Sequence, residues 1–540
     1  MNNFRGRPLV VLAIMLLWRV GLLVFTVQPI PSNDAFGYDG AVVNFLRGGA
    51  YCNPSFALLF PISGTQVYAG YPPLYELALL LWMQAFGTSL VSAMTLHLTL
   101  FAISAYLVLA LIHRFFPAAA DSALVALLLF GFTFGDRPES LAYVFGLGAL
   151  WLVARQISSV LGPNEPPAQP GGPAPTATPA RTRGDHCLAT ALALVLTLLL
   201  GLYTSVIVGA YFFGTGFLAC CVACVWRPSL RWFAPFIGAA VLFAGITGLI
   251  VWREPLWWAG FMESARQQSV TTSGFRMPPP VDLIKLARTA PVFLVGLGLL
   301  PLLFRRRNAL LAQPSAWLAL VAGAFGMGWM LLGLAVTLLA PTYVSYTGFC
   351  QILLAAGILA LVRKLWPQRE RWLRTTLAVC VLVVSVRALG MTTWGVACAW
   401  KNSYASTQAV LDTELKPFIS SREPVLLSSA YLYRAAALGV KNPVHCDWYF
   451  DHAHWTNHAQ MAGLIRCQPP KLVLTQFDYY RGFEVVLDQL RQQPGLVDVQ
   501  VRNLAAVRPP DAIPAFQRVV QHISWAPVIV DLRWNRPHPP

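Results

Sequence analysis

Long uncharged apolar runs constrain this chain more than any other feature of its sequence. Runs of about 18 residues or more recur from Pro8–Thr26 to residues 375–391, and a run of that length crosses the hydrocarbon core of a bilayer as a helix. Only 11% of the 540 residues are charged, whereas a soluble protein carries about 25%. The sequence therefore predicts a polytopic α-helical membrane protein.

We expect about eleven membrane-spanning helices, at 8–26, 89–112, 118–134, 140–155, 187–204, 206–225, 233–251, 287–304, 316–340, 345–362 and 375–391. With the N-terminus in the cytoplasm, Arg and Lys gather in the short internal loops, as the positive-inside rule requires. The formal net charge of +16 therefore reflects membrane topology, with the lipid bilayer as partner and no nucleic acid. We predict a multi-pass protein of the inner (plasma) membrane whose C-terminal part lies outside the cytoplasm.

Composition divides the chain into two domains, a transmembrane domain at 1–391 and an extracytoplasmic α/β domain at 402–540. Within the first we expect an external loop at 27–88 with interfacial helices, and a second external loop at 252–286. Residues 156–186 are rich in Pro and Gly and predict a flexible cytoplasmic linker.

The C-terminal domain carries short β-like runs at Val425, Lys471, Val497 and Pro527, with helix-like segments such as Phe483–Gln493 between them. Its cysteines Cys446 and Cys467 could form a disulfide in an oxidising compartment. A polar cluster could bind zinc, recognise an acceptor or form ordinary surface; it comprises His445, Asp447, Asp451, His452, His454 and His458.

Two aspartates, Asp34 and Asp39, follow the first apolar run, and the turn Tyr71-Pro-Pro-Leu-Tyr-Glu76 returns the chain to the bilayer. Carboxylates cost free energy near lipid, so they mark chemistry or ion handling. Asp34 is the first candidate for a general base and Asp39 the second. The alternative is an aspartate that caps an interfacial helix.

This loop resembles the first external loop of GT-C superfamily glycosyltransferases of the dolichyl-phosphate-mannose mannosyltransferase-like, bacterial polyprenyl-phosphate-sugar-dependent family. Asp34, Tyr38 and a glycine at Gly49 match the spacing of that loop, and the Pro-Pro-Leu turn follows it. The family usually has Glu directly after the aspartate, where this chain has Ala35, so Asp39 is a possible replacement for that second carboxylate.

The resemblance implies binding sites for the sugar and the carrier phosphate. Arg137 lies between Asp136 and Glu139 at an external mouth, where it could clamp two helices or hold the phosphate. A guanidinium binds phosphate oxygens bidentately. Tyr38 belongs to the family's loop pattern, and Tyr71 or Tyr75 could line the cavity. Ser345-Tyr346 stands where many relatives have Arg-Tyr, so the phosphate contact would come from elsewhere. The second external loop adds basic residues at Arg253, Arg266, Arg276 and Lys285.

The resemblance further implies a membrane enzyme that transfers a sugar from a polyprenyl-phosphate-linked donor to a glycan, lipid or protein acceptor, by inverting displacement with Asp34 as base. We expect no cofactor, although a divalent ion between Asp34 and Asp136 or Glu139 is compatible with hard-cation chemistry. A transporter or flippase for lipid-linked glycans is the alternative. The sequence shows neither the internal repeat nor the acidic residues deep in the spans that such a protein would favour. A structural membrane subunit is a second alternative.

Overall fold

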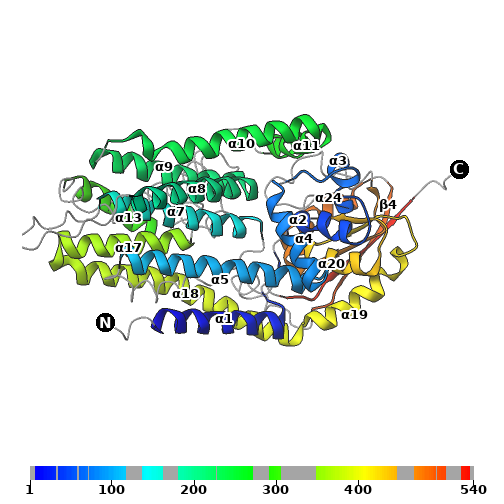
Figure 1. The fold of residues 1–540 in the computed structure, drawn as a ribbon. Coiled ribbons are helices and arrows are strands. Elements are labelled where there is room, and N and C mark those ends of the chain that lie inside the picture. The colour runs from blue at the N-terminus through cyan, green and yellow to red at the C-terminus, as the bar shows by residue number, and fades with distance from the viewer. Residues whose placement is uncertain are drawn as a thin grey trace, which may run out of the picture.

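The computed structural model describes residues 6–28, 30–31, 35–57, 60–70, 72–116, 137–161, 181–226, 228–271, 291–305, 348–446, 467–493, 495–505 and 524–535. These residues form a long helical bundle at one end and an α/β part at the other (Figure 1). The N-terminal helix lies in the bundle, and the chain ends beyond the α/β part.

The bundle consists of long helices that run in roughly the same direction (Figure 1). They are α1 (Gly6–Thr26), α5 (Leu90–Phe115), α7 (Glu139–Leu161), α8 (Arg181–Thr204), α9 (Val206–Trp226), α10 (Ala234–Arg253), α13 (Pro291–Arg305), α17 (Gly348–Leu365) and α18 (Glu370–Lys401). Four of the described helices, α5, α7, α9 and α10, are long and apolar enough to cross a membrane. The bundle is that of an integral membrane protein.

The helices overlap the expected spans wherever the structure describes the chain. Two expected spans, 118–134 and 316–340, lie outside the described residues, so the count of eleven and the orientation stay predictions. The linker expected at 156–186 is shorter at both ends than predicted, because α7 continues to Leu161 and α8 begins at Arg181.

The first external loop folds into α2 (Ala35–Leu46), the 3₁₀ turn η2 (Pro54–Phe56), α3 (Pro61–Thr65) and α4 (Leu74–Phe86). At 13 residues, α4 is only about 20 Å long and too short to cross a bilayer. It starts after Pro73 and ends at Gly87, whose φ of 89° suits glycine. A helix, α4, is therefore present where the sequence predicts one, and its interfacial position stays a prediction.

Asn53 holds this loop together from inside. Its side chain is fully buried, and Nδ2 donates to the carbonyls of Phe36 at 3.0 Å and Gly37 at 3.2 Å. Its Oδ1 accepts from the backbone N–H and the hydroxyl of Ser55. One asparagine thus fixes η2 against the start of α2.

The second external loop begins with α11 (Pro255–Thr271), which packs on α3. Gly260 lets the two helices approach, because a Cβ there would lie 3.2 Å from Ile62 and 3.3 Å from Ala69. The Ile62 N–H donates to Glu263 Oε2 at 3.2 Å. The start of the second loop therefore covers the first.

The C-terminal part has a five-stranded sheet of order β2-β1-β3-β5-β4. Strand β1 pairs in parallel with β2 and β3, and β5 pairs antiparallel with β3 and β4. Its elements are α19 (Tyr404–Leu415), η6 (Lys416–Phe418), β1 (Val425–Leu427), α20 (Ser429–Leu438), β2 (Pro443–His445), β3 (Lys471–Leu474), α23 (Gln476–Asp478), η8 (Tyr479–Phe483), α24 (Glu484–Arg491), β4 (Leu496–Asn503) and β5 (Val528–Trp534).

Each of the four expected β-like runs overlaps a strand, and α24 lies within the expected helix. Strand β2 was not expected, because a run of three residues beginning with Pro443 has little strand character by itself. It forms because a neighbouring strand, β1, supplies its backbone partners.

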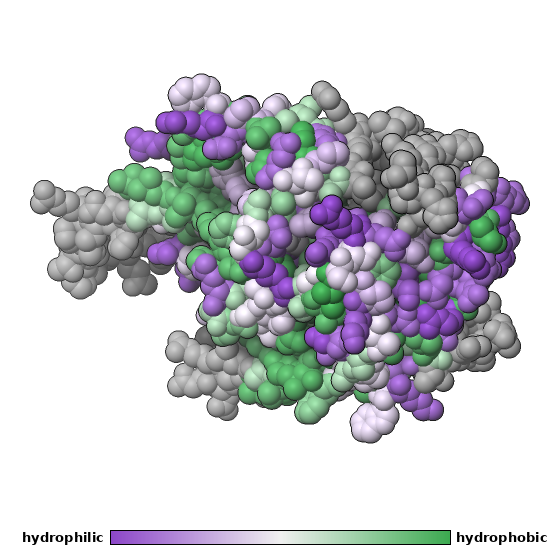
Figure 2. Space-filling view, turned by 90° about the vertical axis from the view of Figure 1, so that its right-hand side faces the viewer, coloured by the Kyte–Doolittle hydropathy of each residue, from purple (hydrophilic) through white to green (hydrophobic). Residues whose placement is uncertain are grey.

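One hydrophobic core crosses the border between the two parts. It contains residues of α2, α4, α5, α19, α20 and β1, among them Val42, Leu79, Leu96, Leu415, Leu432 and Val425. The sheet therefore packs directly on the first external loop. Hydrophilic residues gather over the outer end of the molecule, which the α/β part forms (Figure 2).

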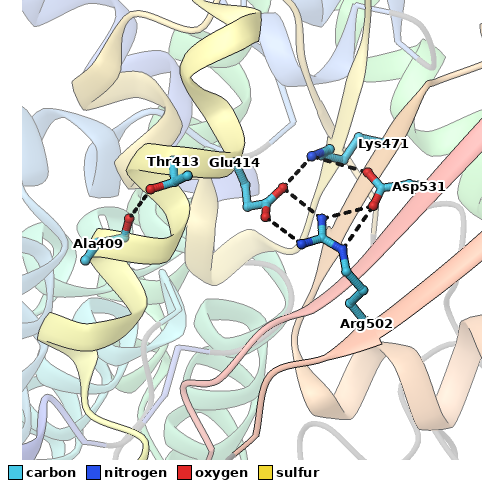
Figure 3. Close-up of polar contacts among 6 residues, drawn as sticks. All are labelled: Ala409, Thr413, Glu414, Lys471, Arg502 and Asp531. Atoms are coloured by element: carbon cyan, nitrogen blue, oxygen red, sulfur yellow. Dashed lines mark hydrogen bonds and ion pairs between the residues drawn. The ribbon is translucent and has the colours of Figure 1, made fainter.

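A closed network of ion pairs ties α19 to the sheet (Figure 3). Arg502 on β4 donates to Glu414 at 3.0 and 3.1 Å and to Asp531 at 2.9 Å. Lys471 on β3 pairs with Glu414 and lies 3.2 Å from Asp531. Burial raises the pKa of Glu414, but the bonds from Arg502 and Lys471 outweigh that effect and hold it below its usual value.

Candidate active site

Asp39 on α2 is the centre of a buried polar group at the border between the two parts. Asp39 is only 1% exposed. The Tyr75 hydroxyl on α4 donates to Oδ1 at 2.9 Å, and the Tyr433 hydroxyl on α20 donates to Oδ2. The second candidate for the base, on α2, is therefore held by side chains from two other elements, α4 and α20.

A hydrogen-bonded chain leads from Asp39 into the helical bundle. Tyr75 Oη lies 2.9 Å from His97 Nε2 on α5, and His97 Nδ1 lies 2.9 Å from Ser140 Oγ on α7. The Ser140 hydroxyl donates to the carbonyl of Arg137 at 2.8 Å. The Tyr75 and His97 rings also stack, with centroids 5.6 Å apart.

Arg137 brings positive charge to the same place. Its Nη2 donates to the Tyr38 hydroxyl at 2.6 Å, and its Nε lies 3.5 Å from Glu139 Oε2. Its guanidinium also lies 5.4 Å from the centroid of the Tyr38 ring. Arg137 therefore bonds to the residue of α2 that directly precedes Asp39. The ion pair with Glu139 is compatible with both of its expected roles, helix clamp and phosphate ligand.

Glu76 is a second buried carboxyl group beside Asp39. It is 2% exposed, and neither carboxyl oxygen has a hydrogen-bond partner in the part of the chain that the structure describes. Burial raises the pKa of Glu76 to about 8, and the charge of Asp39 adds to this increase. Of the two carboxyl groups, Glu76 is therefore the one that keeps its proton near neutral pH.

The carboxyl ends of the parallel strands β1 and β2 meet the first external loop. Ser429, just after β1, accepts a hydrogen bond from the Phe36 N–H at 2.9 Å. The ring of His445, the last residue of β2, lies 5.5 Å from that of Phe56. Ligands of open parallel sheets bind outside the carboxyl ends of the strands, and here that edge borders the Asp39 group.

The structure brings together three of the sequence-predicted site residues, Tyr38, Arg137 and Glu139, and Asp39 follows Tyr38 on α2. Arg253 is exposed at the end of α10, with its guanidinium 5.3 Å from the Trp252 ring. Arg266 belongs to α11. The other predicted residues lie outside the described ranges; they are Asp34, Tyr71, Asp136, Arg276, Lys285, Tyr346 and the polar cluster after Cys446.

Sequence reasoning missed His97, Ser140, Tyr433 and Glu76. A polar residue in an apolar helix is a signal for function, and His97 in α5 carried that signal. Glu76 stood in the Pro-Pro-Leu motif itself. Nothing local marks Tyr433, which is 394 residues from Asp39 along the chain.

Among the described residues no group of three His, Cys, Asp or Glu side chains could hold a metal ion. Asp34 and Asp136, two of the three carboxylates considered for a divalent ion, lie outside those residues. Metal dependence stays a question for experiment.

No protein-family model matches this sequence, and no curated protein matches it. Six chains of solved structures do match.

Two of these structures are of ArnT from Cupriavidus metallidurans. Its crystal structure bound to undecaprenyl phosphate has a TM-score of 0.47 and 11% identity, covering 98% of this chain and 98% of that one. Its structure in the apo state has a TM-score of 0.44 and 12% identity, covering 96% and 97%. At TM-scores and identities this low, the likeness assigns no role to any residue of this chain.

Proposed function

We propose that this protein is a membrane glycosyltransferase that moves a sugar from a polyprenyl-phosphate-linked donor to a lipid, glycan or protein acceptor on the extracytoplasmic face. The observation that supports this most is the buried site in which Asp39 follows Tyr38 and Tyr38 binds Arg137. Sugar transfer needs a base for the acceptor hydroxyl and positive charge for the departing phosphate. One site contains both kinds of group.

The reaction would be a direct displacement with inversion. The acceptor oxygen attacks the anomeric carbon while the bond from that carbon to the phosphate oxygen breaks, and polyprenyl phosphate leaves with the electron pair. Asp34 is the first candidate for the base that takes the acceptor proton, and Asp39 is the second. Arg137 stabilises the phosphate, because its planar fork matches phosphate oxygens.

Basic residues of the second external loop would also bind the donor phosphate. They are Arg253, Arg266, Arg276 and Lys285. Basic and aromatic residues together suit a lipid phosphate at the membrane surface. The acceptor would bind near Ser429 and His445, because that edge of the sheet faces the first loop.

The test uses purified full-length protein in detergent with a panel of undecaprenyl-phosphate sugars, and mass spectrometry to follow the release of undecaprenyl phosphate. We expect wild type to release the lipid phosphate. Asp34→Asn or Asp39→Asn should reduce the rate by about 10²-fold or more, as loss of a general base does, and Arg137→Gln should reduce it similarly. Asp412→Asn is the control, because Asp412 pairs with Arg434 at the surface of the α/β part.

Equal rates in wild type, both aspartate variants and Arg137→Gln would contradict the assignment of the site. No release by wild type, with transport of a fluorescent lipid-linked glycan across liposomes, would favour the flippase. A rate that depends on added Mg²⁺ or Mn²⁺ and is lost with a chelator would establish a metal requirement.

A further inference from the structure

Each group in the hydrogen-bonded series from Asp39 to Arg137 has a fixed number of protons that it can donate. Ser140 has one hydroxyl proton, and it lies between the Arg137 carbonyl at 2.8 Å and His97 Nδ1 at 2.9 Å. A carbonyl can only accept, so this proton points to Arg137. His97 Nδ1 must then carry a proton and donate it to Ser140 Oγ.

Tyr75 likewise has one proton between two possible acceptors, Asp39 Oδ1 and His97 Nε2, each 2.9 Å from its oxygen. In one arrangement a protonated Asp39 donates to Tyr75, Tyr75 donates to Nε2, and the imidazole is neutral. In the other, both protons are shifted: Tyr75 donates to the Asp39 carboxylate and the imidazolium donates from Nε2 to Tyr75. The two arrangements contain the same number of protons, and both make every bond.

Burial keeps the inner part of this chain away from water. Tyr75 is 0% exposed and His97 is 1% exposed. Among the described residues, the charged and titratable groups around it include Glu76 beside Tyr75, Tyr433 on Asp39, Tyr38 and Tyr68 near Asp39, and Arg137 with Glu139 at the start of α7. Burial, followed by the charge of Asp39, raises the pKa of Tyr75 well above its usual value. The phenol therefore stays protonated and passes a proton on without itself becoming charged.

We propose that Asp39, Tyr75 and His97 form a proton relay that moves the acceptor's proton from Asp39 to a histidine inside the bundle. This inference rests on the proposed transferase function and takes Asp39 as the carboxylate that receives the proton. His97 is a positioning and proton-storing residue, because it acts through Tyr75 and does not touch the substrate.

Protons and charges balance along the relay. Before the reaction Asp39 is ionised and accepts from Tyr75, and the imidazole is neutral. When the acceptor proton reaches Asp39, the Tyr75 hydroxyl turns to Nε2 and Asp39 donates to Tyr75. A shift of two protons, from Asp39 to Tyr75 and from Tyr75 to Nε2, restores the carboxylate and leaves an imidazolium. The proton then returns by the same path to the lipid phosphate before it leaves, or to water.

The first arm of the test compares turnover in His97→Gln and Tyr75→Phe with wild type. Glutamine can hold a hydrogen bond to Tyr75 but cannot store a proton, so kcat should fall about tenfold or more with little change in KM. Both variants should change the pH profile of kcat in the same way. Matched controls on the same helix are His113→Gln and Tyr106→Phe, whose side chains are exposed.

The second arm does not need turnover. Histidine labelled with ¹⁵N reports the proton on each ring nitrogen, and the signal lost in His97→Gln identifies His97 among the nine histidines. Asp39→Asn and Tyr75→Phe should each change the protonation of His97 and leave the His113 signal unchanged. Thermal unfolding in detergent shows whether each variant is folded.

Unchanged kcat and pH profile in folded His97→Gln would overturn the relay and leave the transferase function standing. So would a His97 signal that does not respond to Asp39→Asn. Absence of turnover by wild type with every donor, together with a His97 signal coupled to Asp39, would overturn the transferase function while supporting the shared proton.

Discussion

Glu76 is the residue whose chemistry the fold changes most clearly. In water its carboxyl group would be ionised at neutral pH, but burial raises its pKa to about 8. Between about pH 4.5 and 8, the folded protein therefore holds a proton on Glu76 that the unfolded chain has lost. The free energy of unfolding should fall as pH rises through that window, by up to about 1.4 kcal/mol per pH unit.

Replacing Glu76 by Gln should remove this pH dependence. Because Gln is neutral at every pH, Glu76→Gln should unfold at a higher temperature than wild type at about pH 9, and the difference should shrink towards about pH 5. Tryptophan fluorescence during heating in detergent measures both proteins. Glu254→Gln, at an exposed position, is the control. A parallel pH dependence in Glu76→Gln and wild type would contradict the buried, neutral carboxyl group.

Helices α2 and α20 form the contact between elements that defines the site. The Phe36 N–H donates to Ser429, the Phe36 and Tyr433 rings meet edge to face at 4.9 Å, and Tyr433 donates to Asp39. Arg47 adds a bond to the Ala436 carbonyl. The position of the Asp39 carboxylate is therefore decided as much by α20 as by its own helix.

Tyr433→Phe should keep the ring contact and remove one donor to Asp39. We expect a loss of about 1–3 kcal/mol in the free energy of unfolding and a large fall in sugar transfer. Tyr431→Phe is a matched control on the same helix, because its hydroxyl donates to the Trp525 carbonyl at 2.9 Å and not to Asp39. It should lose similar stability and keep its activity. Equal activity in the two variants would remove Tyr433 from the site.

At the scale of the whole molecule, the bundle, the first loop and the sheet share a hydrophobic core. A domain with its own separate core would move relative to its neighbour. Here the apolar faces of α2 and α4 are covered by α20 and β1, so the outer part and the loop should open as one unit.

Leu432→Ala tests this coupling, because Leu432 is fully buried on α20 within the shared core. The substitution should cost about 2–5 kcal/mol. Hydrogen exchange followed by mass spectrometry should then show faster exchange in α2 and α4 as well as in α20. Helix α9, which belongs to the bundle, provides the reference. Faster exchange confined to the α/β part would show that the two parts open separately.

Much of the fold could be predicted because its signals are local. An apolar run of membrane length encodes its own helix whatever surrounds it, so α1, α5 and α10 match their expected ranges. Strands β1, β3 and β5 were visible as short runs rich in Val, Ile and Leu. The candidate site was predicted only in part. Asp39, Tyr38, Arg137 and Glu139 came from motifs, but the hydrogen-bonded partners of Asp39 did not.

Length, hydropathy and charge act on each segment alone, so the sequence predicts the entry into a membrane, the places of the helices and the loop that carries the carboxylates. No single segment shows that Tyr433 meets Asp39, that His97 joins Tyr75 to Ser140, or that Glu76 keeps its proton. These facts depend on burial and on partners far apart along the chain. Packing creates both, and no local pattern encodes them.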